Sequence, residues 1–327
     1  MRNGVFFVDN LNHIPLGKNK IFIIFGKIQV VHQKQIVMSN RIIPPSELII
    51  NEDGSIFHLH IKPEQLADTV ILVGDQGRVN MVASFFDKIE CDVQSREFHT
   101  ITGTLNGKRI SCVSHGIGTD NIDIVVTELD ALKNIDFQTR CVKAQHTTLT
   151  LVRIGTSGGL QDFTPVGSYV VSKRSIGFDG MLRFYELPEG TTDEDFEAKF
   201  CEHTQWNPKL CVPYVVSADE SLVERIGKDM IMGVTISAPG FYGPQGRHVR
   251  ISPADPNLNQ KIMSFDYHGE KITNYEMESS AVAGLAKLLG HKAMTVCCII
   301  AGRVDKSMNT SYKGTMEGLI KTVLERI

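Results

Sequence analysis

Short apolar runs alternate with amphipathic stretches along most of the chain. Residues 69–74 (TVILVG) form an apolar run that ends in glycine, which is typical of a buried strand followed by a tight turn. Residues 77–88 then place apolar side chains at helical spacing. The same patterns predict further strands at 109–118, 148–159, 166–173, 212–218, 231–237 and 293–302, and further helices at 120–134, 277–290 and 312–327.

Strands that alternate with helices indicate an α/β fold with a central mixed, largely parallel β-sheet flanked by helices on both faces. Neither an internal repeat nor a linker interrupts residues 50–327, so we expect a single domain over residues 46–327. Residues 1–45 are predicted to form an N-terminal extension, because the first 37 are rich in Lys, Asn and β-branched residues and show no amphipathic period. We expect this extension to be disordered, or Met38 to be the true initiator.

Composition excludes several classes of protein. The chain has 37 acidic and 34 basic residues, whereas a nucleic-acid binder would show a basic excess or a basic stripe. The apolar run 21–25 is far shorter than the roughly 20 residues that a membrane span needs. The seven cysteines include no C-x-x-C pair, which favours reduced thiols in a cytoplasmic protein. No H-E-x-x-H or similar spacing occurs, so we expect no metal.

Arginines recur near the ends of the predicted strands. Arg78 follows the strand-ending Gly74, Arg153 opens the segment RIGTSGG with Thr156 in its turn, and Arg96 lies between two strand-like runs. Glycine turns at strand ends expose N–H groups, and arginines form short charge-assisted bonds with phosphate. Each feature alone is more typical of an ordinary turn or a surface ion pair, but the set indicates a phosphate site. The chain has neither a P-loop nor a dinucleotide fingerprint.

Two further segments carry candidate chemistry. In NYEMES (274–279), Glu278 could accept hydrogen bonds from the vicinal diol of a sugar while Met277 packs on its apolar face. Acidic residues in the first turn of a helix are an equally good explanation of this segment. In FYGPQGR (241–247), Gln245 and Arg247 match the polar edge of a planar heterocycle, on which Phe241 could stack. A polar surface loop with one buried aromatic residue is the alternative.

Taken together and in order, six segments resemble one family. They are FHL (57–59), GDxxR (74–78), SREF (95–98), RIGTSGG (153–159), FYGPQGR (241–247) and NYEMES (274–279). From about Phe57 to the C-terminus, the chain is similar to the nucleoside phosphorylases of the hexameric bacterial type, and most closely to the uridine phosphorylases among them. The resemblance implies reversible phosphorolysis of uridine to uracil and α-ribose 1-phosphate, with inorganic phosphate as co-substrate and no other cofactor. It also implies a homo-oligomer, a dimer or a hexamer, whose subunits share active sites.

The resemblance assigns a role to each candidate residue. Phosphate binding falls to Gly74, Arg78, Arg153, Thr156 and, from a neighbouring subunit, Arg96. Ribose binding falls to Met277 and Glu278, with Glu276 beside them, and to His58, which reaches the 5′-hydroxyl across the same interface. Base binding falls to Phe241, Gln245 and Arg247, with Ile299 and Ile300 as apolar walls. The residues expected to act directly in catalysis are Arg78, Arg153, Gln245, Arg247 and Glu278.

The chain departs from the family at three places. Purine-specific relatives carry an aspartate after the penultimate strand, where this chain has Gly302 and Arg303, which favours pyrimidines. Asn121 stands where a serine helps to hold an interface potassium ion, so we do not carry that ion over. The segment 137–147 adds length before the phosphate strand and could alter the oligomer contacts.

Three alternatives stay open at this point. They are a purine nucleoside phosphorylase, a nucleosidase that uses water, and a nucleoside sensor without activity. A hydrolase would have no use for the arginines, and a sensor need not keep all three sets of binding residues.

Overall fold

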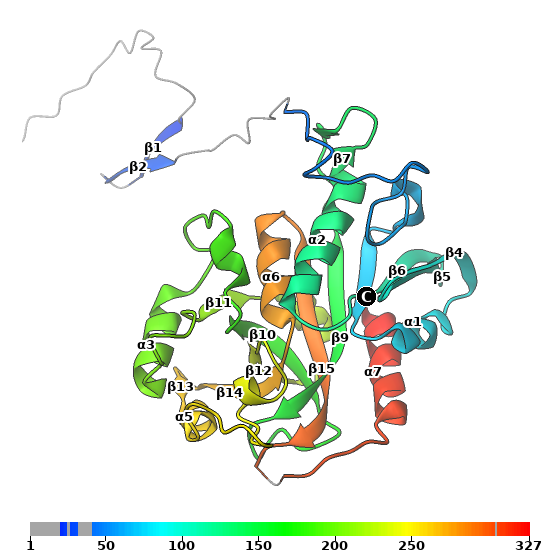
Figure 1. Cartoon of the computed structure of the whole chain (residues 1–327). Coiled ribbons are helices and arrows are strands. Elements are labelled where there is room, and N and C mark those ends of the chain that lie inside the picture. The colour runs from blue at the N-terminus through cyan, green and yellow to red at the C-terminus, as the bar shows by residue number, and fades with distance from the viewer. Residues whose placement is uncertain (1–19, 25–26, 32–40, 305) are drawn as a thin grey trace, which may run out of the picture. The chain divides into compact units, whose positions relative to one another are not determined.

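The computed structural model describes residues 20–24, 27–31, 41–304 and 306–327 (Figure 1). The chain divides into two compact units, Met1–Arg41 and Ile42–Ile327, so the boundary lies close to the predicted one at residue 45. The described part of the first unit is an antiparallel pair of strands, β1 (Lys20–Ile24) and β2 (Lys27–Val31). The remaining predictions for the extension, including those on Met38, lie outside the described residues.

The second unit is built on an eleven-stranded sheet in the order β13-β14-β12-β10-β15-β9-β3-β6-β5-β4, with β11 paired to β10. Its strands are β3 (Thr69–Val73), β4 (Lys88–Ser95), β5 (Phe98–Leu105), β6 (Lys108–Ser114), β9 (Thr150–Gly159), β10 (Tyr169–Gly177), β11 (Tyr214–Ser217), β12 (Ile231–Ser237), β13 (Asp266–Tyr267), β14 (Glu270–Glu276) and β15 (Lys292–Gly302). Strands β6, β3, β9 and β15 run parallel, whereas β5–β6 and β10–β15 are antiparallel pairs. The predicted mixed sheet is therefore confirmed.

Helices and short hairpins complete the unit. The helices are α1 (Gln76–Ala83), α2 (Thr119–Asn134), α3 (Glu194–Thr204), α4 (Glu220–Ile226), α5 (Leu258–Ser264), α6 (Ser279–Leu288) and α7 (Lys313–Arg326). Three single turns of 3₁₀-helix are η1 (Pro63–Gln65), η2 (Met181–Phe184) and η3 (Gly243–Gln245). Strand β7 (Ile135–Asp136) pairs with β8 (Cys141–Val142), which lies in the extra segment predicted at 137–147. Among the described residues, no helix combines the length and the apolar character needed to cross a membrane.

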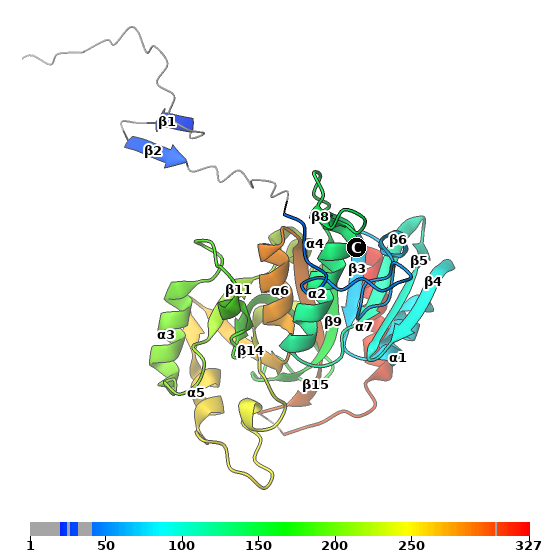
Figure 2. The same cartoon turned by 45° about the horizontal axis from the view of Figure 1, so that its top comes forward.

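The pleat of the central strand divides the core into two layers. Val70 and Leu72 of β3 pack with α2 and α6 on one face of the sheet. These two helices lie side by side in Figures 1 and 2. Ile71 and Val73 pack with α1, α4 and α7 on the other face. Successive side chains of a strand point to opposite faces, so the apolar run of β3 contributes side chains to both layers of the core. A third cluster lies between the outer strands β10, β12 and β14 and helices α3 and α5.

Three predictions about secondary structure need correction. The helix predicted over 77–88 ends at Ala83, because Phe85 and Phe86 turn back onto the apolar layer beside β5. The predicted glycine turn of RIGTSGG lies inside β9, which pairs with β15 as far as Gly159. Helices α3, α4 and α5 were not predicted; α4 and α5 have only seven residues each, and local periodicity is a weak signal at that length. All seven cysteines are free, and four of them are buried.

Candidate active site

A cavity of about 470 Å³ opens at the ends of β3 and β9 and beside the start of α6. It brings together residues that are far apart in the sequence. The predicted site residues that line it are Gly74, Arg78, Arg153, Thr156, Phe241, Gln245, Arg247, Glu276, Met277, Glu278 and Ile300. Candidates for phosphate, sugar and base binding therefore share one cavity.

Arg78 is held at the first turn of α1. The side chain of Asp75, the N-cap residue, accepts a hydrogen bond from the Arg78 N–H at 2.9 Å. The other carboxylate oxygen of Asp75 pairs with Nη2 of Arg78 at 2.9 Å, and Nη1 of Arg78 donates to the carbonyl of Ile154 at 3.3 Å. These contacts fix a buried guanidinium beside the strand end, where helix N–H groups also favour an anion.

Arg153 is the most deeply held cation of the cavity. Its Nη1 lies 2.9 Å from Oε2 of Glu276, its Nη2 pairs with Oε2 of Glu278, and its Nε donates to Nε2 of His115 at 3.3 Å. Burial opposes its charge, but the two carboxylates raise its pKa above the usual range for arginine. The guanidinium is charged at any ordinary pH, as an anion site requires.

Gly155 provides the space for this guanidinium. Residues 153 and 155 point to the same face of β9, and a Cβ atom at position 155 would lie 2.6 Å from Nη1 of Arg153. Real side-chain carbons do not come so close to another atom, so a side chain at 155 would displace the arginine. The glycine of the R-I-G segment is thus part of the site.

Gly155→Ala is expected to raise the KM for phosphate about tenfold or more, because the displaced guanidinium can no longer reach the anion. Steady-state kinetics with phosphate varied checks this. Gly314→Ala is the matched control, since a Cβ there meets nothing within 4 Å and should leave the kinetics unchanged. A Gly155→Ala enzyme with the wild-type KM for phosphate would contradict the assignment.

The two glutamates before α6 do different work. Both oxygens of Glu276 are occupied: they accept hydrogen bonds from the hydroxyls of Ser237 and Ser279, from the N–H of Glu278 and from Arg153. Glu276 therefore anchors the turn and the arginine, although the resemblance placed it beside the sugar. Each oxygen of Glu278 has a single partner, the N–H of Gly118 at 2.8 Å or Arg153, so Glu278 keeps acceptor capacity for a ligand hydroxyl.

The pKa of Glu278 is raised to about 7, because burial outweighs the attraction of Arg153 and the charge of Glu276 adds to the shift. An acid whose pKa is raised on folding binds its proton more tightly in the folded state, so its contribution to stability is lost as the pH rises from about 4.5 to about 7.

Urea unfolding at pH values of about 4.5 and about 7 should show the wild type losing stability relative to Glu278→Gln as the pH rises. The exposed Glu325→Gln variant should follow the wild type; identical behaviour of Glu278→Gln and wild type would contradict the shift.

The loop around η3 also lines the cavity. Arg247 donates to Oε1 of Gln245 at 2.7 Å, and its guanidinium lies 3.6 Å from the centroid of the Phe241 ring. Arg303 also donates to the same Oε1, at 3.0 Å. Two arginines on one oxygen orient the amide of Gln245, so that its NH₂ group is the donor directed away from them. Burial and the nearby charge of Arg303 lower the pKa of Arg247 to about 10.

His58 and Arg96 do not line this cavity, but they lie close to each other. The guanidinium of Arg96 stacks over the ring of Phe57 at 5.5 Å, and that ring meets His58 edge-on at 4.8 Å. Nδ1 of His58 lies 2.6 Å from Oε1 of Glu128, which also accepts the His58 N–H. With Nδ1 donating to the carboxylate, Nε2 of the half-buried ring is left as an acceptor.

Ile299 was predicted as a wall of the cavity, and this is wrong. It is fully buried and lies against the strand pair β9–β15, whereas Ile300 lines the cavity. The register of β15 against β9 shifts between Ile299 and Ala301, and there Ile300 and Ala301 line the cavity while Ile299 packs near Gly159.

The sequence patterns missed several residues of the site or left them without a role, among them His115, Ser157, Gly158 and Arg303. Ser157 and Gly158 line the cavity and belong to the RIGTSGG segment, so their position beside Thr156 was the available signal. Arg303 was noticed only as a departure from purine-specific relatives. Its contact with Gln245 crosses from the end of β15 to the η3 loop, and no local pattern reveals such a contact.

The structure also brings together Asp130, His146 and His291, whose potential ligand atoms lie within 4.8 Å of one another. Nδ1 of His291 accepts the N–H of Leu149 at 3.1 Å, so the ring proton sits on Nε2, which lies 3.1 Å from Oδ1 of Asp130. A histidine that ligates a metal donates its other ring N–H instead. The group fits a buried histidine–aspartate contact better than a metal site.

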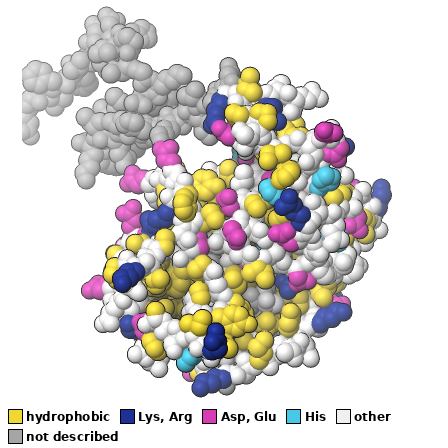
Figure 3. All heavy atoms as spheres, viewed as in Figure 1, with side chains coloured by type: hydrophobic (Ala, Val, Ile, Leu, Met, Phe, Trp, Pro, Cys, Tyr) yellow, Lys and Arg dark blue, Asp and Glu magenta, His cyan; other side chains and the backbone are white. Residues whose placement is uncertain are grey.

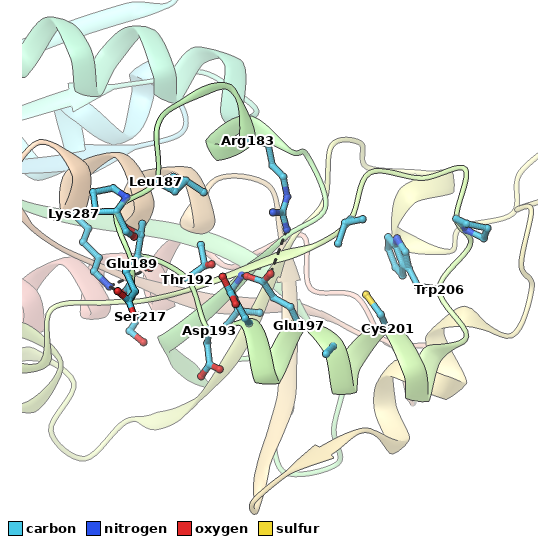
Figure 4. A pocket seen from close by; sticks show the side chains of 18 residues that line it. Arg183, Leu187, Glu189, Thr192, Asp193, Glu197, Cys201, Trp206, Ser217 and Lys287 are labelled. Atoms are coloured by element: carbon cyan, nitrogen blue, oxygen red, sulfur yellow. Dashed lines mark hydrogen bonds and ion pairs between the residues drawn. The ribbon is translucent and has the colours of Figure 1, made fainter.

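A larger hollow of about 1000 Å³ lies between η2, α3 and the start of β11 (Figure 4). Its cations are already paired: Arg183 with Glu197 at 3.3 Å, and Lys287 with the carbonyls of Gly190 and Thr191. None of the predicted site residues lines it. Size alone therefore does not identify the functional cavity.

Comparison with known proteins gives consistent results. Residues 68–323 match the model of the phosphorylase superfamily. A uridine phosphorylase of Thermococcus kodakarensis is 29% identical over 259 residues, 77% of this chain and 79% of that protein. A DeoD-type purine nucleoside phosphorylase of Colwellia psychrerythraea is 25% identical over 281 residues, 82% of this chain and 98% of that protein. A solved Trypanosoma brucei nucleoside phosphorylase, described as showing uridine phosphorylase activity, has a TM-score of 0.78 at 29% identity, covering 85% of this chain and 98% of that one.

Proposed function

The chain belongs to the phosphorylase superfamily, and we propose that it catalyses the reversible phosphorolysis of uridine to uracil and α-ribose 1-phosphate. The observation that carries the proposal is the cavity of about 470 Å³, whose lining includes Arg78 and Arg153, the buried carboxylate of Glu278, and the amide and guanidinium of Gln245 and Arg247. These groups match the chemistry of a phosphate, a ribose and the polar edge of a pyrimidine.

Breaking the bond between ribose C1′ and uracil N1 builds positive charge on the sugar and negative charge on the base. Arg78 and Arg153 would hold the phosphate dianion below the sugar, where it stabilises the cationic carbon and then bonds to it. Glu278 would accept hydrogen bonds from ribose hydroxyls and so keep C1′ in line with the phosphate oxygen. The reaction uses phosphate as co-substrate and, as proposed, no other cofactor.

The base end of the cavity supports a pyrimidine. Gln245 can donate to one uracil carbonyl, while Arg247 donates to the other and stabilises the charge that moves onto it as the bond breaks. Arg303 donates a hydrogen bond to Gln245, and as an arginine it offers no carboxyl group at this position that could donate a proton to N7 of a purine. The departing base then takes up one proton to become uracil.

A second copy of the chain would complete the site. His58 and Arg96 lie together outside the cavity of their own subunit, as expected of groups that serve a neighbour. Ile117 lines the cavity and is 70% exposed, and many apolar side chains reach the surface on the face shown in Figure 3. Exposed apolar groups at the mouth of the cavity fit a homo-oligomer with shared active sites.

The test is loss of uridine followed by absorbance, with and without inorganic phosphate, and with inosine in parallel. Phosphate-dependent loss of uridine with inosine untouched is the expected result. Cleavage without phosphate would indicate a nucleosidase, and preference for inosine would indicate a purine enzyme. Binding of uridine without turnover would indicate a sensor, and each of these outcomes would overturn the proposal.

A further inference from the structure

His115 is a buried histidine that none of the assigned roles uses. It follows β6 directly, and its main-chain N–H donates to the carbonyl of Val73 at 2.9 Å, which ties it to the end of β3. Its Cε1 lies 3.9 Å from the position of a Cβ atom on Gly74. The ring therefore sits beneath the turn that leads to Arg78, behind the cavity rather than in its lining.

The printed side-chain hydrogen bond of this ring is to Arg153, whose Nε donates to Nε2 at 3.3 Å. A guanidinium can only donate, so Nε2 must be an acceptor, and the proton of the neutral ring sits on Nδ1. Nδ1 has no hydrogen-bond partner among the described residues. Burial and the charges of Arg153 and Arg78 lower the pKa of His115 well below its usual value, which keeps the ring neutral.

A neutral acceptor is what this position requires. Nη1 and Nη2 of Arg153 already face two carboxylates, so a third carboxylate at Nε would only add negative charge where a phosphate dianion has to bind. Without any acceptor, Nε would be a buried donor without a partner and the guanidinium plane could turn toward the glutamates. Bonds on all three nitrogens hold that plane while leaving the net charge unchanged.

We propose that His115 is a positioning residue for phosphate binding, which fixes the guanidinium of Arg153 through Nε without neutralising it. The inference rests on the proposed function, because Arg153 is assigned there to the phosphate. His115 does not touch the substrates. Its effect should therefore appear in the affinity for phosphate and not in that for the nucleoside.

The test compares four substitutions. In His115→Gln the side-chain oxygen can replace Nε2 as acceptor, whereas His115→Phe keeps a ring without an acceptor and His115→Asn is too short to reach. We expect His115→Phe and His115→Asn to raise the KM for phosphate about tenfold, with the KM for uridine changed less than about twofold, and His115→Gln to recover most of the loss. His291→Phe, which removes another buried histidine outside the cavity, should lower stability but leave the KM for phosphate unchanged.

Protection against heating by inorganic phosphate alone gives a second readout that does not depend on uridine turnover. If the wild type does not cleave uridine but His115→Asn still weakens protection by phosphate, the proposed substrate is wrong and the inference on His115 stands. If the wild type cleaves uridine and His115→Asn matches it in both phosphate readouts, the inference is overturned. Equal losses in His115→Gln and His115→Asn would also overturn it, because they would point to packing instead of the acceptor.

Discussion

Arg153→Ala is expected to lower kcat/KM for phosphorolysis at least about a thousandfold, which corresponds to about 4 kcal/mol of transition-state stabilisation. The substitution removes charge-assisted hydrogen bonds to the phosphate, each of which contributes about 1.5–3 kcal/mol. It also leaves Glu278 facing the incoming dianion without a counter-charge. Steady-state kinetics with phosphate and uridine varied separately measures the loss.

Loss of folding must be separated from loss of chemistry in this variant. Removing Arg153 leaves Glu276 and Glu278 buried without their cation, and breaking such a pair costs about 3–5 kcal/mol of folding free energy. Arg153→Met combined with Glu278→Gln removes one charge of each sign, so this double variant should fold better and stay inactive. Arg174→Ala breaks ion pairs with Asp193 and Glu270 outside the cavity and should retain activity. A folded Arg153→Ala enzyme within tenfold of the wild type would contradict the role.

Two inactive variants are expected to restore activity when their subunits are mixed. If each active site uses Arg153 from one subunit and Arg96 from its neighbour, each variant by itself, Arg96→Ala or Arg153→Ala, inactivates every site of its oligomer. In a mixed pair, one site carries both defects and the other carries none. Random pairing in a dimer makes half of the dimers mixed, so an equimolar mixture should recover about a quarter of the wild-type activity.

The controls for mixing follow from the same geometry. Arg78→Ala mixed with Arg153→Ala should recover nothing if both defects fall in the same site, because Arg78 and Arg153 line one cavity of one subunit. His58→Ala should behave like Arg96→Ala and complement Arg153→Ala, since His58 and Arg96 flank the same Phe57 ring. Failure of Arg96→Ala and Arg153→Ala to complement in co-expressed, co-purified oligomers would contradict the shared site.

Much of the fold could be predicted from local pattern. The apolar runs that became β3, β6, β9 and β15, and the amphipathic stretches that became α2, α6 and α7, were identified because burial on one or two faces imposes a period on the sequence. The six motifs were also sufficient to predict the resemblance to nucleoside phosphorylases, which the match over residues 68–323 supports. Helices α4 and α5 have seven residues each and were missed because two turns carry too few periodic positions, and the 11-residue α3 was missed as well.

The chemistry of the site depended on contacts between segments far apart in the chain. Motifs identified Arg153 and Glu278. Only the contact between β9 and the turn before α6 showed that the two are paired, and that Glu276 already accepts bonds from Arg153 and Ser237. In the sheet, β3 lies between β6 and β9, and His115, which follows β6, reaches past the end of β3 to Nε of Arg153. Residue types and their order determine which chemistry is available to this protein. Which groups touch, and therefore which remain free for phosphate, is decided by tertiary structure, because hydrogen bonding and charge act over a few ångströms in space and not along the sequence.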